Sequence, residues 1–330
     1  MVIEILTKNL IVRHPTMDDV NAASDVMAAC DIAECGQIEI TEEDLQTDWQ
    51  TPDFNLETDA WVVSTPEGQI VAFADVGHRK HAKIFAFGRV HPEYCDQGIG
   101  THLLRLAEAR AHWHLAEAQP ELRITLNGWV SSVNLAAQQL LEHEGFKRVR
   151  GSWHMQIELD EAPSVPEWPD GITVRTFIPG QDNRAVFEAV DEAFHDHWGH
   201  IPMEYEKWEH WEIRRESFDP SLWFLALDGD EIAGVSLCYN ESATGLGWVG
   251  TLGVRRPWRR KGLGIALLRH SFGELYRRGL PKVKLGVDSQ NLTGATRLYE
   301  RAGMHIVRQF YTYEKELRAG IELSTQTISD

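Results

Sequence analysis

A cationic loop with two glycines, residues 259–264 (Arg-Arg-Lys-Gly-Leu-Gly), has the clearest chemistry in this 330-residue chain. It follows an apolar strand that ends near Val254 and leads directly into an apolar helix. The first turn of a helix has free N–H groups, and glycine lets an anion approach the backbone closely. Arg259 and Lys261 would add positive charge. The loop therefore predicts a phosphate site, although its spacing is neither that of a P-loop nor that of a dinucleotide-binding fingerprint.

A downstream segment carries a possible proton donor. A strand over 283–287 is followed by Asn291, then by a helix that carries Tyr299, and then by Gly303. The order of these features, with the tyrosine four residues before a helix-ending glycine, resembles the acetyl-CoA core of the GNAT N-acetyltransferase superfamily. The resemblance implies an acyltransferase that uses acetyl-CoA as co-substrate.

The resemblance also assigns the cofactor to particular positions. In this superfamily a bulge separates the central strand from its neighbour, and the freed backbone groups pair with the pantetheine arm. We expect Gly253 to be the bulge residue, the N–H of Leu252 or Val254 to polarise the thioester carbonyl, and Tyr299 to protonate the departing sulfur. The cofactor-binding set implied is Leu252, Gly253, Val254, Arg259, Arg260, Lys261, Gly262, Leu263, Gly264, Ile265, Asn291 and Tyr299.

The sequence leaves several candidates for the general base. Mycothiol synthase-like proteins have a glutamate on the central strand, where this chain has Trp248, which cannot accept a proton. The alternatives are Glu241 or Tyr239 on the preceding strand, His197 or Asp196 in the segment before it, and a water chain without a dedicated base. The loss of the glutamate argues against mycothiol chemistry in this chain.

The acceptor side is predicted in residues 194–212, which combine aromatic and acidic side chains. Such a combination can hold an ammonium group before transfer. We expect the acceptor to be a small, cationic primary amine. The candidate substrate-binding residues are Asp196, His197, Trp198 and Tyr239.

The two halves of the chain repeat one another. Val12 recurs as Val174 and Trp61 as Trp223, both 162 residues later, and a segment rich in proline lies between the halves. The repeat predicts two domains in tandem. The resemblance implies that both are GNAT domains with an α/β (α+β) fold, each a mixed, mostly antiparallel sheet flanked by helices. We expect domains at 1–158 and 171–330, joined by a linker at 159–170.

The halves differ where chemistry is expected. Cys95 takes the place of Arg259, Asp96 follows it, and Leu141 takes the place of Tyr299. A carboxylate beside a pyrophosphate is repulsive. We therefore expect catalysis in the C-terminal domain alone, with at most a second CoA site in the first. The residues of that second site would be Val90, Gly98, Ile99 and Gly100.

The composition limits the partners. A formal net charge of −18 disfavours nucleic acid and anionic membranes. The four cysteines have no zinc spacing, and His112 and His114 have no obvious distant partner, so no metal is expected. The cysteine usage suits the cytoplasm, and the N-terminal segment reads as a strand rather than a signal peptide. A monomer or a homodimer is expected.

Two other functions fit the same residues. The chain could be a non-catalytic acyl-CoA sensor or regulatory protein, which the missing strand glutamate favours and Tyr299 opposes. It could instead be an acyltransferase that uses another acyl-CoA, or that modifies a protein N-terminus or lysine. Fold analogy does not identify the acceptor.

Overall fold

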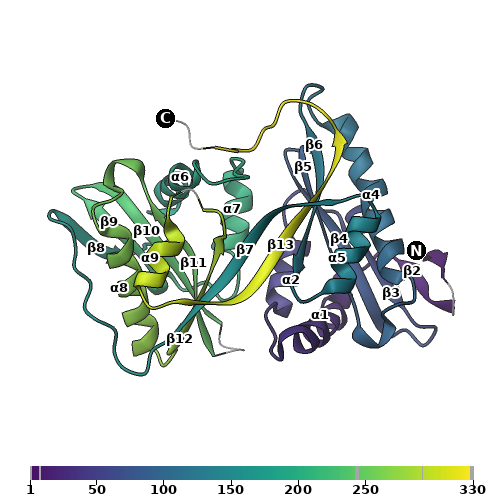
Figure 1. The fold of residues 1–330 in the computed structure, drawn as a ribbon, viewed down its shortest axis with the longest axis horizontal. Coiled ribbons are helices and arrows are strands. Elements are labelled where there is room, and N and C mark those ends of the chain that lie inside the picture. The colour runs from purple at the N-terminus through teal and green to yellow at the C-terminus, as the bar shows by residue number, and fades with distance from the viewer. Residues whose placement is uncertain (1, 7–8, 242–244, 292, 328–330) are drawn as a thin grey trace. The chain divides into compact units, whose positions relative to one another are not determined.

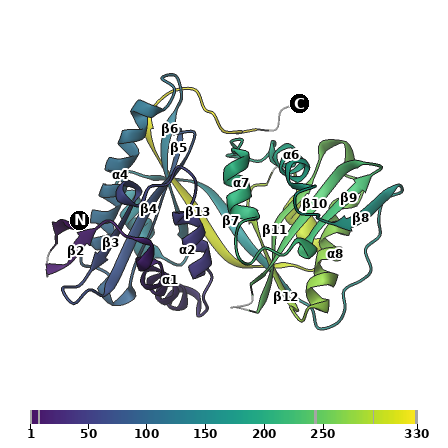
Figure 2. The same ribbon diagram turned by 180° about the vertical axis from the view of Figure 1, so that it is seen from behind.

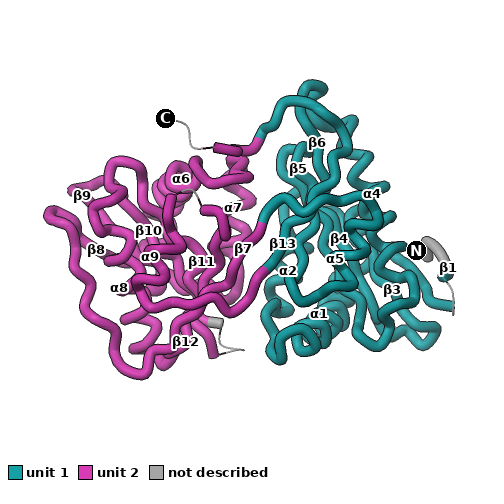
Figure 3. Tube along the Cα trace, viewed as in Figure 1, with its two compact units in different colours: residues 1–150, 310–323 teal, residues 151–309, 324–330 magenta. Residues whose placement is uncertain are grey.

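The computed structural model describes residues 2–6, 9–241, 245–291 and 293–327. The chain divides into two compact units, which Figure 3 shows in different colours. Unit 1 contains residues 1–150 and 310–323, and unit 2 contains residues 151–309 and 324–330.

Unit 1 is built on a mixed sheet with the strand order β1-β2-β3-β4-β5-β6-β13. Every neighbouring pair is antiparallel except β5 and β6, which are parallel. Its strands are β1 (Val2–Ile5), β2 (Ile11–Arg13), β3 (Ala60–Ser64), β4 (Ile70–Arg79), β5 (Lys83–Val90), β6 (Ile124–Ser131) and part of β13 (His305–Arg318). Its helices are α1 (Val20–Cys35), α2 (Glu42–Trp49), α3 (Leu56–Asp59), α4 (Ile99–Glu117) and α5 (Leu135–His143).

Helices cover both faces of this sheet (Figure 1). Successive side chains of a strand point to opposite faces, so β3 contributes to two separate cores. Val62 packs with α1 and α2, whereas Trp61 and Val63 pack with α4 and α5. Burial on both faces explains why all five residues of β3 are buried.

Unit 2 repeats this plan with the strand order β8-β9-β10-β11-β12-β7. Only β11 and β12 are parallel among its neighbouring pairs. Its strands are β8 (Ile172–Thr176), β9 (Trp223–Asp228), β10 (Glu231–Glu241), β11 (Leu246–Val254), β12 (Lys282–Asp288) and part of β7 (Lys147–Glu158). Its helices are α6 (Asn183–Phe194), α7 (Tyr205–Glu212), α8 (Leu263–Arg277) and α9 (Ala295–Arg301).

The two faces of the second sheet also carry different helices. Trp223 and Leu225 of β9 pack with α6 and α7, whereas Phe224 between them packs with α8 and α9. Figure 2 shows α6, α7 and α8 beside the strands of this sheet. Because side chains alternate along β9, the helices that pack with Phe224, α8 and α9, lie on the same face of the sheet. This pairing matters because these helices carry the glycine loop and Tyr299.

Each unit takes its last strand from the other half of the sequence. β7 follows α5 of unit 1, yet Ser152–Glu158 pair with β12 of unit 2. β13 follows α9 of unit 2, yet Phe310–Arg318 pair with β6 of unit 1. The units therefore depart from a simple division at 1–158 and 171–330, because the strands after Gly145 and Gly303 are exchanged.

The expected fold class is confirmed by these sheets and helices. Residues 159–170 have no helix or strand, as their prolines require. The four cysteines form no disulfide. Within the described ranges, no helix combines the length and apolar character needed to cross a bilayer.

Candidate active site

The glycine loop forms an open helix N-terminus in unit 2. Gly262 is the N-cap of α8 and has φ +88°, while Arg260 two residues earlier has φ +62°. The left-handed conformation at 262 favours glycine. No side chain of the described residues caps the helix, and its first internal bond runs from Ala266 N to Gly262 O. The N–H groups of the first turn can therefore bind an anion.

The loop borders a cavity of about 750 Å³. The lining comes from β11, the loop, the start of α8, the end of β12 and α9. It includes most of the predicted cofactor residues: Leu252, Gly253, Val254, Arg259, Arg260, Gly262, Leu263, Gly264, Ile265, Asn291 and Tyr299. Lys261 is exposed and does not line it. Sequence reasoning missed three further cations in the lining, Arg269, Arg297 and Arg301.

Arg259 faces the protein as well as the cavity. Its Nε donates to Val254 O at 3.0 Å, its Nη2 donates to Ala193 O at 3.0 Å, and its Nη1 lies 2.6 Å from Asp196 Oδ2. These contacts tie the loop to the end of β11 and to α6. The first role of this guanidinium in the structure is therefore to hold the loop in place.

Asp196 is the anchor of the loop. The side chain is 1% exposed, and its carboxylate is bound by Arg256 and Arg259. The guanidinium of Arg256, together with that of Arg259, holds the pKa of the Asp196 carboxyl well below its usual range. This carboxylate lies outside the cavity lining and stays ionised, which makes it a poor candidate for a base or for a contact to the acceptor.

β11 and β12 separate beside the cavity. Their parallel pairing covers only Gly247, Trp248 and Val249 of β11. A bulge lies next to this point, because Leu237 pairs with Thr251 and Cys238 with Val249, which leaves Gly250 as the extra residue. The strands beyond the bulge leave room for an extended chain to pair with β11.

The prediction of Gly253 as the bulge residue is wrong. Gly253 pairs regularly with Val235, and a Cβ there would lie 3.0 Å from the Cβ of Ala193 on α6. Glycine is needed at 253 because a helix packs against it. At Gly250 a Cβ would lie 2.5 Å from the ring of Tyr239, so this position too requires glycine.

The orientation of the β11 backbone follows from two contacts. Arg255 N donates to Ala233 O on the β10 side, and Arg259 Nε binds Val254 O on the opposite side. Backbone groups alternate along a strand, so the N–H groups of Leu252 and Val254 point away from β10, toward the gap. These are the two N–H groups that the sequence analysis left as alternatives.

Tyr299 is a buried tyrosine on the cavity wall. It is 7% exposed, and none of the described residues forms a hydrogen bond with its hydroxyl. Burial raises the pKa of Tyr299 to about 12, so the phenol keeps its proton near neutral pH. An unpaired phenol in this position can donate a hydrogen bond to a group inside the cavity.

Among the predicted base and acceptor residues whose side chains the structure describes, His197 alone lines the cavity. Its ring lies 4.4 Å from that of Phe194, and burial lowers its pKa. The imidazole is therefore mainly neutral near pH 7 and can accept a proton. Asp288, at the end of β12, also lines the cavity and supplies negative charge.

Other predicted acceptor residues lie elsewhere. Trp198 donates from Nε1 to Gln326 Oε1 at 2.8 Å and so holds the C-terminal segment. Tyr239 donates to Glu212, and its ring covers Gly250. Burial raises the pKa of Glu212, a residue that sequence reasoning passed over. The side chain of Glu241 lies outside the described residues, although its backbone pairs with Leu246.

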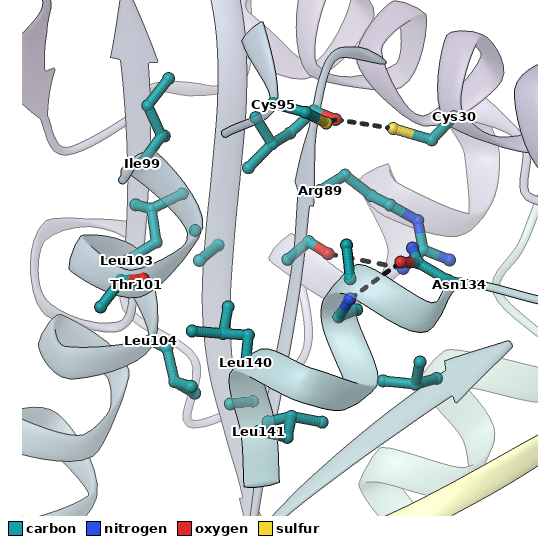
Figure 4. A pocket seen from close by; sticks show the side chains of 18 of the residues that line it. Cys30, Arg89, Cys95, Ile99, Thr101, Leu103, Leu104, Asn134, Leu140 and Leu141 are labelled. Atoms are coloured by element: carbon teal, nitrogen blue, oxygen red, sulfur yellow. Dashed lines mark hydrogen bonds between the residues drawn. The ribbon is translucent and has the colours of Figure 1, made fainter. Parts of the chain in front are cut away.

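Unit 1 has a counterpart of this cavity, of about 310 Å³. Figure 4 shows Ile99, Leu103 and Leu141 among its apolar side chains. The lining includes all four residues predicted for a second CoA site: Val90, Gly98, Ile99 and Gly100. Gly98 has φ +78° and Asp96 has φ +59°, so the loop has the same backbone shape as in unit 2.

The counterpart differs from the unit 2 cavity in three ways. Leu141 is buried at the position of Tyr299, which leaves no hydroxyl. β5 keeps a regular register with β4 along its whole length, with no bulge. The thiol of Cys30 donates to Val90 O at 3.2 Å, and burial raises its pKa to about 12. The thiol is thus protonated and a poor nucleophile.

Comparisons with known proteins agree with this architecture. Residues 183–304 match the model of the acetyltransferase (GNAT) family, and residues 57–148 match an acetyltransferase (GNAT) domain. A mycothiol acetyltransferase from Streptomyces scabiei is 34% identical over 234 residues, which cover 69% of this chain and 68% of that protein.

Two solved structures resemble the whole chain. A GCN5-related N-acetyltransferase from Sphaerobacter thermophilus is 38% identical, with a TM-score of 0.80 over 98% of this chain and 100% of that one. A tandem GNAT protein from the clavulanic acid biosynthesis pathway is 17% identical, with a TM-score of 0.73 over 94% and 100%. The latter supports the fold alone.

The family of this chain follows from these relatives and from the two repeated units. The expected enzyme class is confirmed, and the family uses an acyl-CoA as co-substrate. The chain belongs to the GNAT family of N-acetyltransferases, with two GNAT domains in tandem.

Proposed function

We propose that unit 2 transfers an acetyl group from acetyl-CoA to the primary amine of a small molecule. One observation carries this proposal: a helix N-terminus and the phenol of Tyr299, neither of which is bound by a side chain in the described part of the chain, border the same cavity. A phosphate site and a proton donor in one cavity are what an acyl-CoA with a thiolate leaving group requires. Unit 1 lacks the phenol at the matching position.

The residues present fit this co-substrate. The N–H groups of the first turn of α8, with Arg260 beside them, would hold the pyrophosphate. The gap beyond the bulge at Gly250 would hold the pantetheine arm against β11. The thioester supplies an electrophilic carbonyl, which the N–H of Leu252 or Val254 can polarise. Tyr299, protonated near neutral pH, would give the departing sulfur a hydrogen bond or its proton.

For the acceptor, we propose a small molecule whose amine enters beside His197 and Asp288. A free amine is mostly protonated near pH 7 and must lose a proton before it attacks. Asp288 would attract the ammonium form, and neutral His197 would accept its proton directly or through one water. The Streptomyces scabiei relative is named for mycothiol, but this chain has Trp248 where the resemblance to mycothiol synthase-like proteins implies a strand glutamate, and this difference favours another amine.

The test is release of free thiol on mixing the protein with acetyl-CoA and a panel of amines. The panel should contain small mono- and diamines, amino sugars, amino acid derivatives, and peptides with a free N-terminus or lysine. We expect turnover with a small amine and much slower turnover with the peptides. Binding of acetyl-CoA without thiol release from any amine would support the regulatory alternative, and faster turnover with peptides would contradict a small acceptor.

The pH dependence of the same assay tests His197. Because neutral His197 is the required form, kcat/KM should rise with pH through the pKa of His197, which burial places below its ordinary value of 6.5. His197→Asn should lower kcat/KM at pH 7 by roughly 10–10²-fold and remove this acid limb. The half-buried His200, which lies 3.2 Å from Asp191 and outside the cavity, gives the control His200→Asn. An unchanged acid limb in His197→Asn would show that another group is the base.

A further inference from the structure

Three histidines of unit 1 form a cluster away from its cavity. His78 lies near the end of β4, His81 lies in the turn between β4 and β5, and His114 lies near the end of α4. One ring nitrogen from each lies within 4.8 Å of the other two. None of the three lines the cavity of unit 1, whose wall includes Ile99 at the other end of α4.

The rings face one another closely. His81 Nδ1 and His114 Nδ1 are 2.7 Å apart, and the centroids of His78 and His81 are 4.1 Å apart in a stacked arrangement. Two facing ring nitrogens at this distance need one shared proton. The ring of His114 is 2% exposed, and its Nε2 is buried without a partner among the described residues. Among the described residues, the orphaned ring nitrogen of this cluster is therefore His114 Nε2.

We propose that His78, His81 and His114 bind one divalent transition-metal ion of the Zn²⁺ class. Three imidazoles suit zinc, copper, nickel or cobalt, whereas magnesium and calcium prefer oxygen ligands. Zn–N bonds of about 2.0–2.1 Å in a tetrahedral site place ligand nitrogens about 3.3–3.4 Å apart. The separations in the cluster, from 2.7 Å to at most 4.8 Å, bracket that value, so small ring rotations complete the site. The fourth position is left for water.

The site would fasten the β4–β5 turn to the end of α4. Lys80 and His81 in this turn have φ +50° and +54°, a left-handed conformation that non-glycine residues rarely adopt. A metal shared between His81 in the turn and His114 on the helix would hold that conformation. The role is structural, because α4 carries His114 fifteen residues after Ile99, about 22 Å along the helix axis.

The neighbouring charges set the expected affinity. Three basic residues lie in or beside the turn, and their positive charge opposes binding of a metal cation: Arg79, Lys80 and Lys83. Arg110, on the same helix as His114, is bound by Asp59 at 2.6 Å, which offsets its charge. We therefore expect a dissociation constant for Zn²⁺ of about 1–10 µM rather than in the nanomolar range.

The expectation of no metal came from the spacing of the histidines along the chain. His112 and His114 were the visible pair, but they lie two residues apart on a helix and point in different directions. His112 is exposed. The ligands that accompany His114 come from a turn more than thirty residues earlier, and only the packing of α4 on β4 and β5 brings them together.

The experiment is a titration of the full-length protein, free of any affinity tag, with Zn²⁺ alone in competition with a chromophoric chelator. The variants are His78→Asn and His81→Asn, both at half-buried positions, and the matched control is His112→Asn on the same helix as His114. We expect one site in the parent, at least 10-fold weaker binding in each variant, and unchanged binding in the control. Co²⁺ in place of Zn²⁺ should give the absorption of a tetrahedral centre.

Thermal unfolding supplies an independent readout. Zn²⁺ at about 100 times its dissociation constant should raise the Tm of the parent by roughly 5 °C and leave that of His81→Asn unchanged. Chelation should leave thiol release by unit 2 unaltered, which separates this inference from the proposed function. Binding only above about 100 µM, or equal losses in His81→Asn and His112→Asn, would overturn the site and leave a packed histidine cluster.

Discussion

Tyr299→Phe should lower kcat by roughly 10²-fold while leaving the KM for acetyl-CoA nearly unchanged, because the variant removes a proton donor and little else. The side chain is buried on the cavity wall, and its hydroxyl has no partner among the described residues. Loss of an unpaired buried hydroxyl costs no hydrogen bond, so the Tm should not fall. Any large drop in turnover can then be assigned to chemistry.

The matched control for this variant is Tyr276→Phe. Tyr276 is a half-buried tyrosine of α8 that packs on the same core but does not line the cavity. Its variant should retain full turnover. If Tyr299→Phe turns over as fast as the parent, Tyr299 is a packing residue and the sulfur receives its proton from elsewhere.

Gly262→Glu should abolish most activity, whereas Gly98→Glu should leave turnover within about twofold of the parent, since distant sites act independently. The two glycines are well matched. Both are N-caps in the left-handed region, with φ +88° and +78°, and a Cβ at either would meet no atom within 4 Å. The backbone strain of the two substitutions is therefore nearly the same, about 1–2 kcal/mol.

The difference between these variants then reports the position of the active site. A carboxylate at 262 would face the pyrophosphate, and repulsion of a few kcal/mol at an effective dielectric near 20 corresponds to a loss of roughly 10²-fold or more in kcat/KM for acetyl-CoA. We expect Gly262→Glu and Gly98→Glu to lower the Tm equally, and only Gly262→Glu to lower the activity strongly. Loss of activity in Gly98→Glu alone, with the protein folded, would move the chemistry to unit 1.

Local sequence patterns were sufficient to predict the loop and its helix. Glycine at 262 and 264 followed by apolar residues specifies a turn and a helix start, and these depend only on nearby residues. The match between the two glycine loops was also visible in the sequence. The structure gives both loops the same backbone shape, with a left-handed residue at Asp96 and at Arg260. The order of elements was read along each half, and the mixed sheet was implied by the resemblance to the GNAT superfamily.

Contacts between distant residues were not predictable in the same way. Asp196 was predicted as a candidate base and acceptor contact, but it pairs with Arg256, 60 residues later, and is buried. The bulge was assigned to Gly253 rather than Gly250. Both are glycines, and the sequence does not show that a helix packs on Gly253 and a tyrosine ring on Gly250.

The strand exchange shows a further limit. β7 and β13 occupy equivalent places in the two repeats, so antiparallel pairing with β12 or with β6 satisfies the same backbone groups. Nothing in the alternation of either strand distinguishes its own sheet from the other. The exchange therefore depends on connections and packing that no local pattern encodes.

A crystal structure of the protein with CoA tests the central claim most directly. The account predicts CoA in unit 2, with its pyrophosphate at the N–H groups of Leu263 and Gly264 and its pantetheine arm along Leu252 and Val254. The sulfur should lie within hydrogen-bond distance of the Tyr299 hydroxyl. CoA bound only in the cavity of unit 1, or a sulfur remote from Tyr299, would contradict it.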